Sequence, residues 1–225
     1  MKIRRFDKVE AENGFVASYT HMGGKIGVLV DVETDVVNDA VKEMAKNIAM
    51  QIAALKPEFI SEAEISEEHA AREKEVIISQ SLNSPDTLPK PILNALIQKA
   101  ISDKVWSDED IAIFEEKKSN MQFVFNFLSK EAKPQLAQLA IADRANIEAN
   151  KICMGAVEGR IKKQLKEVCL MNQVYVKAED GKQIVSKYID EVAKANNAKI
   201  VIKSFVRYET GEGLEKKNED FAAEV

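Results

Sequence analysis

The sequence is poor in the residues that build catalytic and metal sites. Its 225 residues include two histidines and two cysteines, and neither His21 nor His69 pairs with Cys153 or Cys169 as a base–nucleophile couple. The glycine-rich loops that hold phosphates in nucleotide-binding proteins are missing, as are clustered metal-ligand spacings. We therefore expect a protein that is not an enzyme and has no bound metal or cofactor.

Cysteine is also too sparse for a disulfide framework. Cys153 and Cys169 fall on what the pattern predicts to be one helix, where a rise of about 1.5 Å per residue would separate them by roughly 24 Å. Reduced thiols of this kind are typical of cytoplasmic proteins. No apolar run approaches the ~20 residues of a membrane helix, and no signal-peptide pattern opens the chain. We expect a soluble, cytoplasmic protein with no membrane partner.

Positive charge is in deficit. The chain has 32 Lys and Arg against 37 Asp and Glu, which gives a net charge of −5. Nucleic-acid binders gain most of their affinity by neutralising phosphates with basic side chains, so the balance argues against direct nucleic-acid binding. The lysines in 161–166 are interpreted as the solvated edge of a helix. With 45% hydrophobic residues the chain is of globular composition.

Strand signals gather near the start of the chain. Alternating residues predict strands over 2–10 and 14–20, and Asn13-Gly14 between them is typical of a tight hairpin. Met22-Gly23-Gly24 supplies the next turn, because glycine adopts positive φ without a Cβ clash. The β-branched run 25–32 then predicts a central strand. Together these segments predict an antiparallel three-stranded meander.

A helix follows this meander. Apolar residues recur at helical spacing from Val37 to Leu55, with polar residues on the opposite side. Thr34 or Asp35 is the expected N-cap, and Pro57 ends the helix. We expect its apolar stripe to pack across the meander.

The middle of the chain is helical. Ser66 is expected to cap a polar helix over 67–82, and Pro134 suits the first turn of a long helix over 134–169. The narrow apolar seam of the long helix predicts one helical partner, so the two form an antiparallel hairpin. Residues 83–133 would enlarge its tip. Within that tip we expect two helices, over 91–102 and 108–129, the second capped by Ser107 with Asp110.

The end of the chain returns to mixed structure. Strands are predicted over 173–177 and 199–208, with a helix over 181–196 between them and a short final helix over 215–225. The predicted class is α+β: a small antiparallel sheet packed with helices, plus a protruding antiparallel helical hairpin with an enlarged helical tip. The expected domains are an α+β core of 1–60 and 170–225 and a hairpin of 61–169.

Several blocks resemble one family in order along the chain. They are Ile3-Arg-Arg-Phe6, Tyr19-Thr-His-Met-Gly-Gly-Lys-Ile-Gly-Val-Leu29, Asn47-Ile-Ala-Met-Gln-Ile-Ala-Ala-Leu-Lys-Pro-Glu-Phe59, Val157-Glu-Gly-Arg-Ile-Lys-Lys163, Glu167-Val-Cys-Leu170, Phe205-Val-Arg-Tyr-Glu-Thr-Gly-Glu-Gly-Leu-Glu215 and Asp220-Phe-Ala-Ala-Glu-Val225. These blocks resemble elongation factor Ts, the guanine nucleotide exchange factor of elongation factor Tu. The match covers most of the chain outside 83–133.

The resemblance implies a particular part of that family's architecture. The matched blocks belong to the C-terminal half of the core, a coiled-coil hairpin and a C-terminal module. The N-terminal domain and a clear first copy of the core are missing from the match, so we expect a C-terminal fragment. The family's Thr-Asp-Phe-Val motif, which disturbs the GTPase's magnesium and phosphate site, has its nearest counterpart in Glu33-Thr34-Asp35-Val36-Val37. We interpret this string as a degenerate second copy, in which Val36 replaces the phenylalanine.

The resemblance also implies which residues meet the partner. Two glycines in a turn give a partner close access to the backbone, although His21 beside them could equally be a turn residue with no role. Likewise, the 33–37 string could simply begin a helix. The expected partner-binding residues are Tyr19, His21, Met22, Gly23, Gly24, Asp35, Val36, Gly211, Gly213 and Phe221.

The implied function is binding of elongation factor Tu and promotion of GDP release. Without the wedge phenylalanine, we expect this chain to dock but to exchange poorly. The alternative is a structural module that self-associates through its hairpin, as a homodimer, motivated by the aromatic segment 114–127. The sequence leaves open the oligomeric state, the role of 83–133, the sheet face that docks the GTPase and any exchange role of 33–37.

Overall fold

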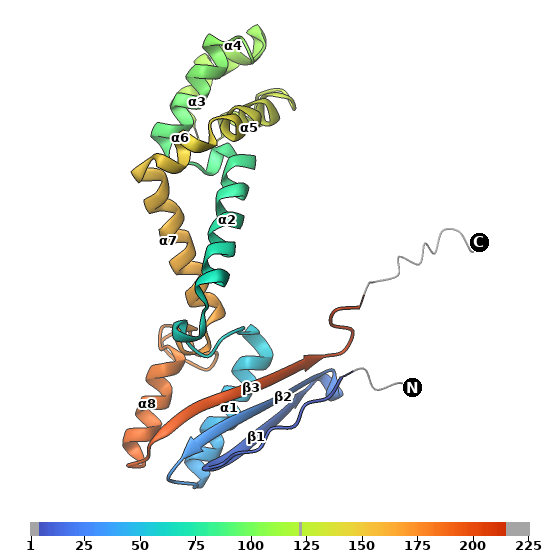
Figure 1. The fold of residues 1–225 in the computed structure, drawn as a ribbon, viewed down its shortest axis with the longest axis vertical. Coiled ribbons are helices and arrows are strands. Elements are labelled where there is room, and N and C mark those ends of the chain that lie inside the picture. Colours follow the sequence, from blue (N-terminus) through green and yellow to red (C-terminus); the bar gives the residue numbers. More distant parts are fainter. Residues whose placement is uncertain (1–4, 122, 215–225) are drawn as a thin grey trace, which may run out of the picture. The chain divides into compact units, whose positions relative to one another are not determined.

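The computed structural model describes residues 5–121 and 123–214, which divide into two compact units (Figure 1). The sheet unit takes in Met1–Glu64 and Lys166–Val225, and the helical unit takes in Ile65–Leu165. The expected α+β class is confirmed: the described residues form one three-stranded antiparallel sheet and eight α-helices. The final helix predicted over 215–225 lies outside the described residues.

The sheet pairs the two ends of the chain. Its strands are β1 (Gly14–His21), β2 (Ile26–Thr34) and β3 (Ile200–Glu209), in the order β1-β2-β3 with both pairs antiparallel (Figure 1). The strand predicted over 199–208 is therefore confirmed.

The predicted local meander is wrong at its first strand. Residues 5–13 form no strand, and the third member of the sheet is β3. Alternation in the sequence cannot show which segment pairs with which, and β2 takes its second partner from far along the chain. Asn13-Gly14 makes no hairpin. Gly14 starts β1 with φ +128°, so close to β2 that an added Cβ would lie 2.1 Å from the Val32 carbonyl oxygen.

Helix α1 (Asp39–Leu55) packs on one face of the sheet. Val28, Val30 and Val32 of β2 are buried there with Met44 and Ile48 of α1. Full burial of a side chain of this size stabilises the fold by about 1.5–3 kcal/mol, so this layer is the main core of the sheet unit.

The ends of α1 differ in part from expectation. The N-cap is Asn38, whose Oδ1 accepts a hydrogen bond from the Val41 amide at 2.9 Å, so the predicted caps Thr34 and Asp35 are wrong. Both belong to the preceding strand and turn, where extended backbone continues to residue 34. At the other end, Lys56 adopts φ +50° and closes the helix just before Pro57.

A buried glutamine explains why the strand predicted over 173–177 does not form. Gln51 of α1 is fully buried, and its Nε2 donates to the Val174 carbonyl at 3.0 Å while its Oε1 accepts from the Val176 amide at 2.8 Å. The side-chain amide thus takes the place of a neighbouring strand on one side, while on the other side the segment bonds the backbone of residues 183 and 185 around the isolated Val174–Ile184 bridge.

The next helix is shorter than predicted. Helix α8 (Val185–Ala195) starts four residues later than position 181, because Asp180 accepts hydrogen bonds from the amides of Lys182 and Gln183 in a turn. Val185 and Ile189 of α8 are buried in the core formed by α1 and the sheet.

The helical unit has its own core. Its helices are α2 (Glu67–Asn83), α3 (Lys90–Ser102), α4 (Asp108–Lys117), α5 (Ala132–Ala142), α6 (Arg144–Ala149) and α7 (Lys151–Val168), the last ending within the sheet unit. Its core gathers Ile77, Leu82, Ile97, Trp106, Leu136 and Val157, among others. Arg160 donates to Ser81 at 2.8 Å and Gln164 donates to Glu73, so α2 and α7 run antiparallel.

Two predicted helices are broken. The single helix predicted over 134–169 is three helices, with breaks at Asp143 and Asn150. At the second break Asn150 leaves helical geometry, and its Oδ1 accepts from the Ile152 and Cys153 amides as a new N-cap. The helix predicted over 108–129 ends at Lys117 and continues as 3₁₀ turns. By contrast, the predicted cap residues Ser66 and Ser107 both accept the expected amide hydrogen bonds.

The two cysteines are free, and burial raises the pKa of each thiol. They do not share one helix, since Cys169 follows the last residue of α7. None of the helices in the described ranges combines the length and apolar character that crossing a membrane requires.

A buried carboxylate fixes the tip of the helical unit. Asp110 is 3% exposed, and it accepts hydrogen bonds from the Ser129 amide at 2.7 Å and from the hydroxyls of Ser129 and Ser107 at 2.8 Å each. Burial alone would raise the pKa of Asp110, but these hydrogen bonds outweigh it, and the pKa lies below its usual value.

Replacing this carboxylate should destabilise the helical unit. We expect Asp110→Ala to lower the free energy of unfolding by about 1.5–3 kcal/mol, because charged hydrogen bonds are lost and buried donors are left unpaired. Asp108→Ala, at an exposed position of the same helix, should cost less than about 1 kcal/mol. Urea unfolding followed by fluorescence of the buried Trp106, the only tryptophan, measures both. Equal effects would contradict this role of Asp110.

The stability that the Asp110 carboxylate contributes should be lost at acidic pH. Because the folded-state pKa of Asp110 is depressed, its stabilisation is complete above the ordinary pKa of 3.8 and is lost as the pH falls below it. The difference in stability between the native chain and Asp110→Ala should therefore shrink below about pH 4. Paired urea titrations at several pH values measure this difference, and a constant difference down to pH 2 would contradict the assignment.

Candidate functional site

Most of the predicted partner-binding residues meet at one end of the sheet. His21 at the end of β1 pairs with Ile26 at the start of β2, and Ile26 pairs with Glu209 at the end of β3. The Thr210 amide also donates to the Lys25 carbonyl at 2.8 Å. We call residues 19–25 and 208–214 at this end the rim. It brings together Tyr19, His21, Met22, Gly23, Gly24, Gly211 and Gly213.

The turn between β1 and β2 leaves its backbone open. Met22, Gly23 and Gly24 all have positive φ, at 50°, 65° and 90°. All three are exposed, Met22 to 62%, and a Cβ added to either glycine would meet no atom within 4 Å. An exposed apolar side chain beside bare backbone gives another protein both something to bury and room to approach.

Tyr19 and His21 form a pair on β1. They are two residues apart, so both side chains lie on the same side of the strand. The Tyr19 hydroxyl and His21 Nδ1 are 2.9 Å apart, and the rings stack with centroids 5.9 Å apart at 29°. Tyr19 is half-buried against the core and His21 is exposed.

Charged side chains missed by the sequence analysis surround the end of β3. The Glu209 carboxylate accepts from Lys56 at 2.8 Å and from Arg207 at 2.7 Å, and these hydrogen bonds lower its pKa to about 2. Arg207 is 7% exposed, and its Nε is buried without a hydrogen-bond partner. The sequence shows that Arg207 and Glu209 lie on the same side of one strand. It does not show that Lys56, at the end of α1, lies beside them.

A shallow groove of about 400 Å³ runs along this end of the sheet. Arg5 lies over the Tyr208 ring at 4.3 Å and donates to Glu212 at 2.7 Å, and Tyr208 also bonds Asp7. Gly24, Gly27 and Gly211 line the remainder, with Leu214 59% exposed. The groove therefore combines bare backbone and apolar surface with paired charges.

Asp35 and Val36 lie at the opposite end of the sheet. They follow β2, whose nine residues span roughly 26 Å at ~3.3 Å per residue. The exposed Asp35 accepts a hydrogen bond from the Lys199 amide at 2.7 Å, which ties the loop after β2 to the segment before β3, and Val36 is half-buried. Phe221 lies outside the described residues.

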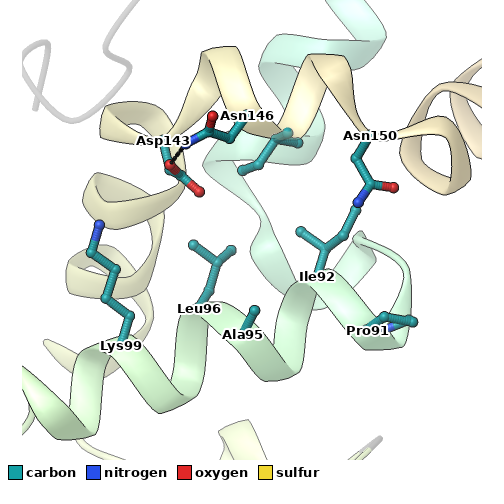
Figure 2. A pocket seen from close by; sticks show the side chains of 9 residues that line it. Pro91, Ile92, Ala95, Leu96, Lys99, Asp143, Asn146 and Asn150 are labelled. Atoms are coloured by element: carbon teal, nitrogen blue, oxygen red, sulfur yellow. Dashed lines mark hydrogen bonds between the residues drawn. The ribbon is translucent and has the colours of Figure 1, made fainter.

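The helical unit carries a second concavity, of about 300 Å³, that sequence reasoning did not find (Figure 2). Figure 2 shows Ile92, Ala95 and Leu96 of α3 facing Asp143 and Asn146, with Asn146 donating to Asp143 at 2.6 Å. No base–nucleophile pair lines it. Across the described ranges, no group of three or more His, Cys, Asp and Glu side chains is arranged to hold a metal ion.

Comparison with known proteins assigns the family. A sequence model of the family "Elongation factor TS" matches residues 1–126 and 126–212. The chain belongs to this family. Among its relatives, elongation factor Ts of Clostridium botulinum strain Eklund 17B is 36% identical, that of Clostridium perfringens strain SM101 34%, and that of Clostridioides difficile strain 630 35%, each over all 225 residues.

The match covers all of this chain but only part of each elongation factor Ts relative. It includes every residue of the chain but 53% of each relative. The chain thus spans about half the length of the curated relatives it matches. Both the rim and the helical unit lie within the range matched to these relatives.

The rim's charge network predicts a measurable titration. Carboxyl ¹³C NMR should place the pKa of Glu209 near 2, and Lys56→Met should raise it towards the ordinary 4.5, because one donor is lost. Lys42→Met, at an exposed position of α1, should leave it unchanged. Since the folded-state pKa is depressed, the stability that it adds is complete above pH 4.5 and is lost as the pH falls towards 2. A Glu209 titration near 4.5 in the native chain would contradict the network.

Proposed function

We propose that the chain acts in translation elongation, by binding elongation factor Tu through the rim and contributing to the release of GDP. One observation carries the proposal beyond family membership: seven residues predicted for docking share one exposed end of the sheet. Neighbouring strand ends bring them together from both ends of the sequence. No bond-making chemistry is proposed for the chain.

The rim suits docking because its recognition elements are held rigidly. Exposed Met22 and Leu214 offer apolar surface, and the positive-φ turn offers backbone. The Glu209 network holds charged groups in fixed positions, so little side-chain freedom is left to lose on binding.

Exchange requires more than docking. A ligand shifts the GTPase towards its nucleotide-free state only as far as it binds that state better than the nucleotide-bound state. The 33–37 string lies at the far end of the sheet from the rim, and Asp35 is engaged by Lys199. We therefore propose that this chain supplies affinity and little of the preference that drives GDP release.

We therefore expect the chain to bind elongation factor Tu without efficiently accelerating the release of GDP. In stopped-flow experiments with fluorescent GDP on elongation factor Tu, saturating chain should accelerate release far less than a full-length relative does. Calorimetry should give affinities for the GDP-bound and nucleotide-free forms within about fivefold, since coupling of exchange-factor size would require ΔG differences of several kcal/mol. Acceleration equal to that by the full-length relative would contradict the proposal.

A matched glycine pair tests the rim itself. Gly23 and Gly181 are both exposed, with φ of 65° and 62° and no atom within 4 Å of an added Cβ. Substitution by Gln adds the same left-handed strain at both, about 1–2 kcal/mol. Gly23→Gln should weaken binding to elongation factor Tu at least tenfold, because it blocks close approach to the turn, whereas Gly181→Gln should not. Equal affinities for the two variants would exclude the turn from the interface.

The alternative of self-association has support from the helical unit. Phe123 and Phe127 are 49% and 54% exposed there. Sedimentation analysis of the chain alone and with elongation factor Tu separates the two functions. A stable dimer with no affinity for the GTPase would favour the alternative and contradict the rim proposal.

A further inference from the structure

Tyr19 is anchored against the core of the sheet unit and contacts His21, which is exposed and accessible to a partner. Tyr19 pairs with Val28 of the central strand and packs against the core, whereas His21 is at the exposed end of β1. The hydroxyl of Tyr19 lies 2.9 Å from Nδ1 of His21. No described residue is hydrogen-bonded to the other ring nitrogen, Nε2.

The ring's tautomer depends on the direction of this hydrogen bond, because Nδ1 accepts in one neutral tautomer and donates in the other. A neutral imidazole carries one N–H and one acceptor nitrogen, and the proton's position is set by the bond that the other nitrogen makes. If the phenol O–H donates to Nδ1, that nitrogen is the acceptor and the proton resides on Nε2. The stacking of the two rings, 29° from parallel, also limits rotation of the imidazole.

We propose that Tyr19 is a positioning residue, which holds His21 in the Nε2–H tautomer so that the rim presents an N–H donor to an acceptor oxygen, a carbonyl or carboxylate, of the docked protein. The inference rests on the proposed docking function and adds the chemistry of one contact. Preorganisation of this kind strengthens binding because the ring loses little freedom and need not change tautomer in the complex.

The tautomer is testable in the free chain. Two-bond ¹H–¹⁵N NMR correlations at alkaline pH, where imidazoles are neutral, separate the two tautomers. Native His21 should be in the Nε2–H form, and Tyr19→Phe, which keeps the ring but not the hydroxyl, should give a mixture. His69 of α2 is the only other histidine and should be unchanged. A native His21 in the Nδ1–H form would overturn the inference, whatever the chain binds.

Binding measurements with variants of Tyr19 and His21 test whether the Nε2–H group of His21 contacts the partner. Tyr19→Phe should weaken binding to elongation factor Tu about three- to tenfold, and His21→Ala more strongly. In the His21→Ala background Tyr19→Phe should have no further effect, because its action passes through His21. His21→Gln, whose amide N–H reproduces the Nε2 donor, should recover much of the affinity and be insensitive to Tyr19→Phe.

The outcomes separate this inference from the proposed function. If the native chain binds elongation factor Tu but Tyr19→Phe and His21→Ala bind equally well, the inference fails and the rim proposal stands. If the two effects are additive, Tyr19 acts through packing and the positioning role is overturned. If the native chain does not bind, the proposed function fails together with the donor role of His21, while the NMR measurement still decides the tautomer.

Discussion

The pairing of β2 with β3 is the interaction on which the rest of the sheet unit depends. It hydrogen-bonds residues more than 160 positions apart, from Ile26–Glu209 to Thr34–Ile200. Without it, α1 would cover an incomplete sheet, and the rim would lose the half contributed by residues 208–214. Closing so long a loop costs conformational entropy, although the cost grows only slowly with loop length. Burial of β2 valines beneath α1 offsets that cost, because Val28, Val30 and Val32 are at most 2% exposed.

The elements that the sequence predicted well are those whose signal is local. The periodicity of α1, the β-branched runs of β2 and β3, and the caps Ser66 and Ser107 each arise within a few neighbouring residues. The errors have a common cause in distant partners. The segment before β1 alternates like a strand but does not pair with the outer edge of β1, and its Arg5 and Asp7 instead contact Tyr208 of β3 through their side chains. The segment at 173–177 loses its strand pairing to the buried amide of Gln51.

The candidate site, too, has some features that local sequence predicts and others that depend on distant residues. The sequence could suggest the rim residues because their identities match a family block and their glycines predict an open turn. It could not suggest the Glu209 network, whose members come from the C-cap of α1, from β3 and from the segment after β3. The separation of Asp35 from the rim, by contrast, follows from the length of the one predicted strand that lies between them in the sequence. The Tyr19–His21 spacing is visible in the sequence, whereas the hydrogen bond that gives it meaning is not.

This separation bears on how such a sheet could influence a GTPase. A strand of fixed length keeps the rim and the 33–37 string roughly 26 Å apart. A single compact patch on a partner can therefore meet one or the other, but a partner must extend along the sheet to meet both. If the rim alone makes contact, the free energy of docking is nearly the same for every nucleotide state whose contacted surface is unchanged, and the nucleotide equilibrium does not move. Exchange then has to come from a second contact whose energy differs between states. Under the proposed docking mode the rim would supply affinity, and exchange would originate elsewhere than in the rim.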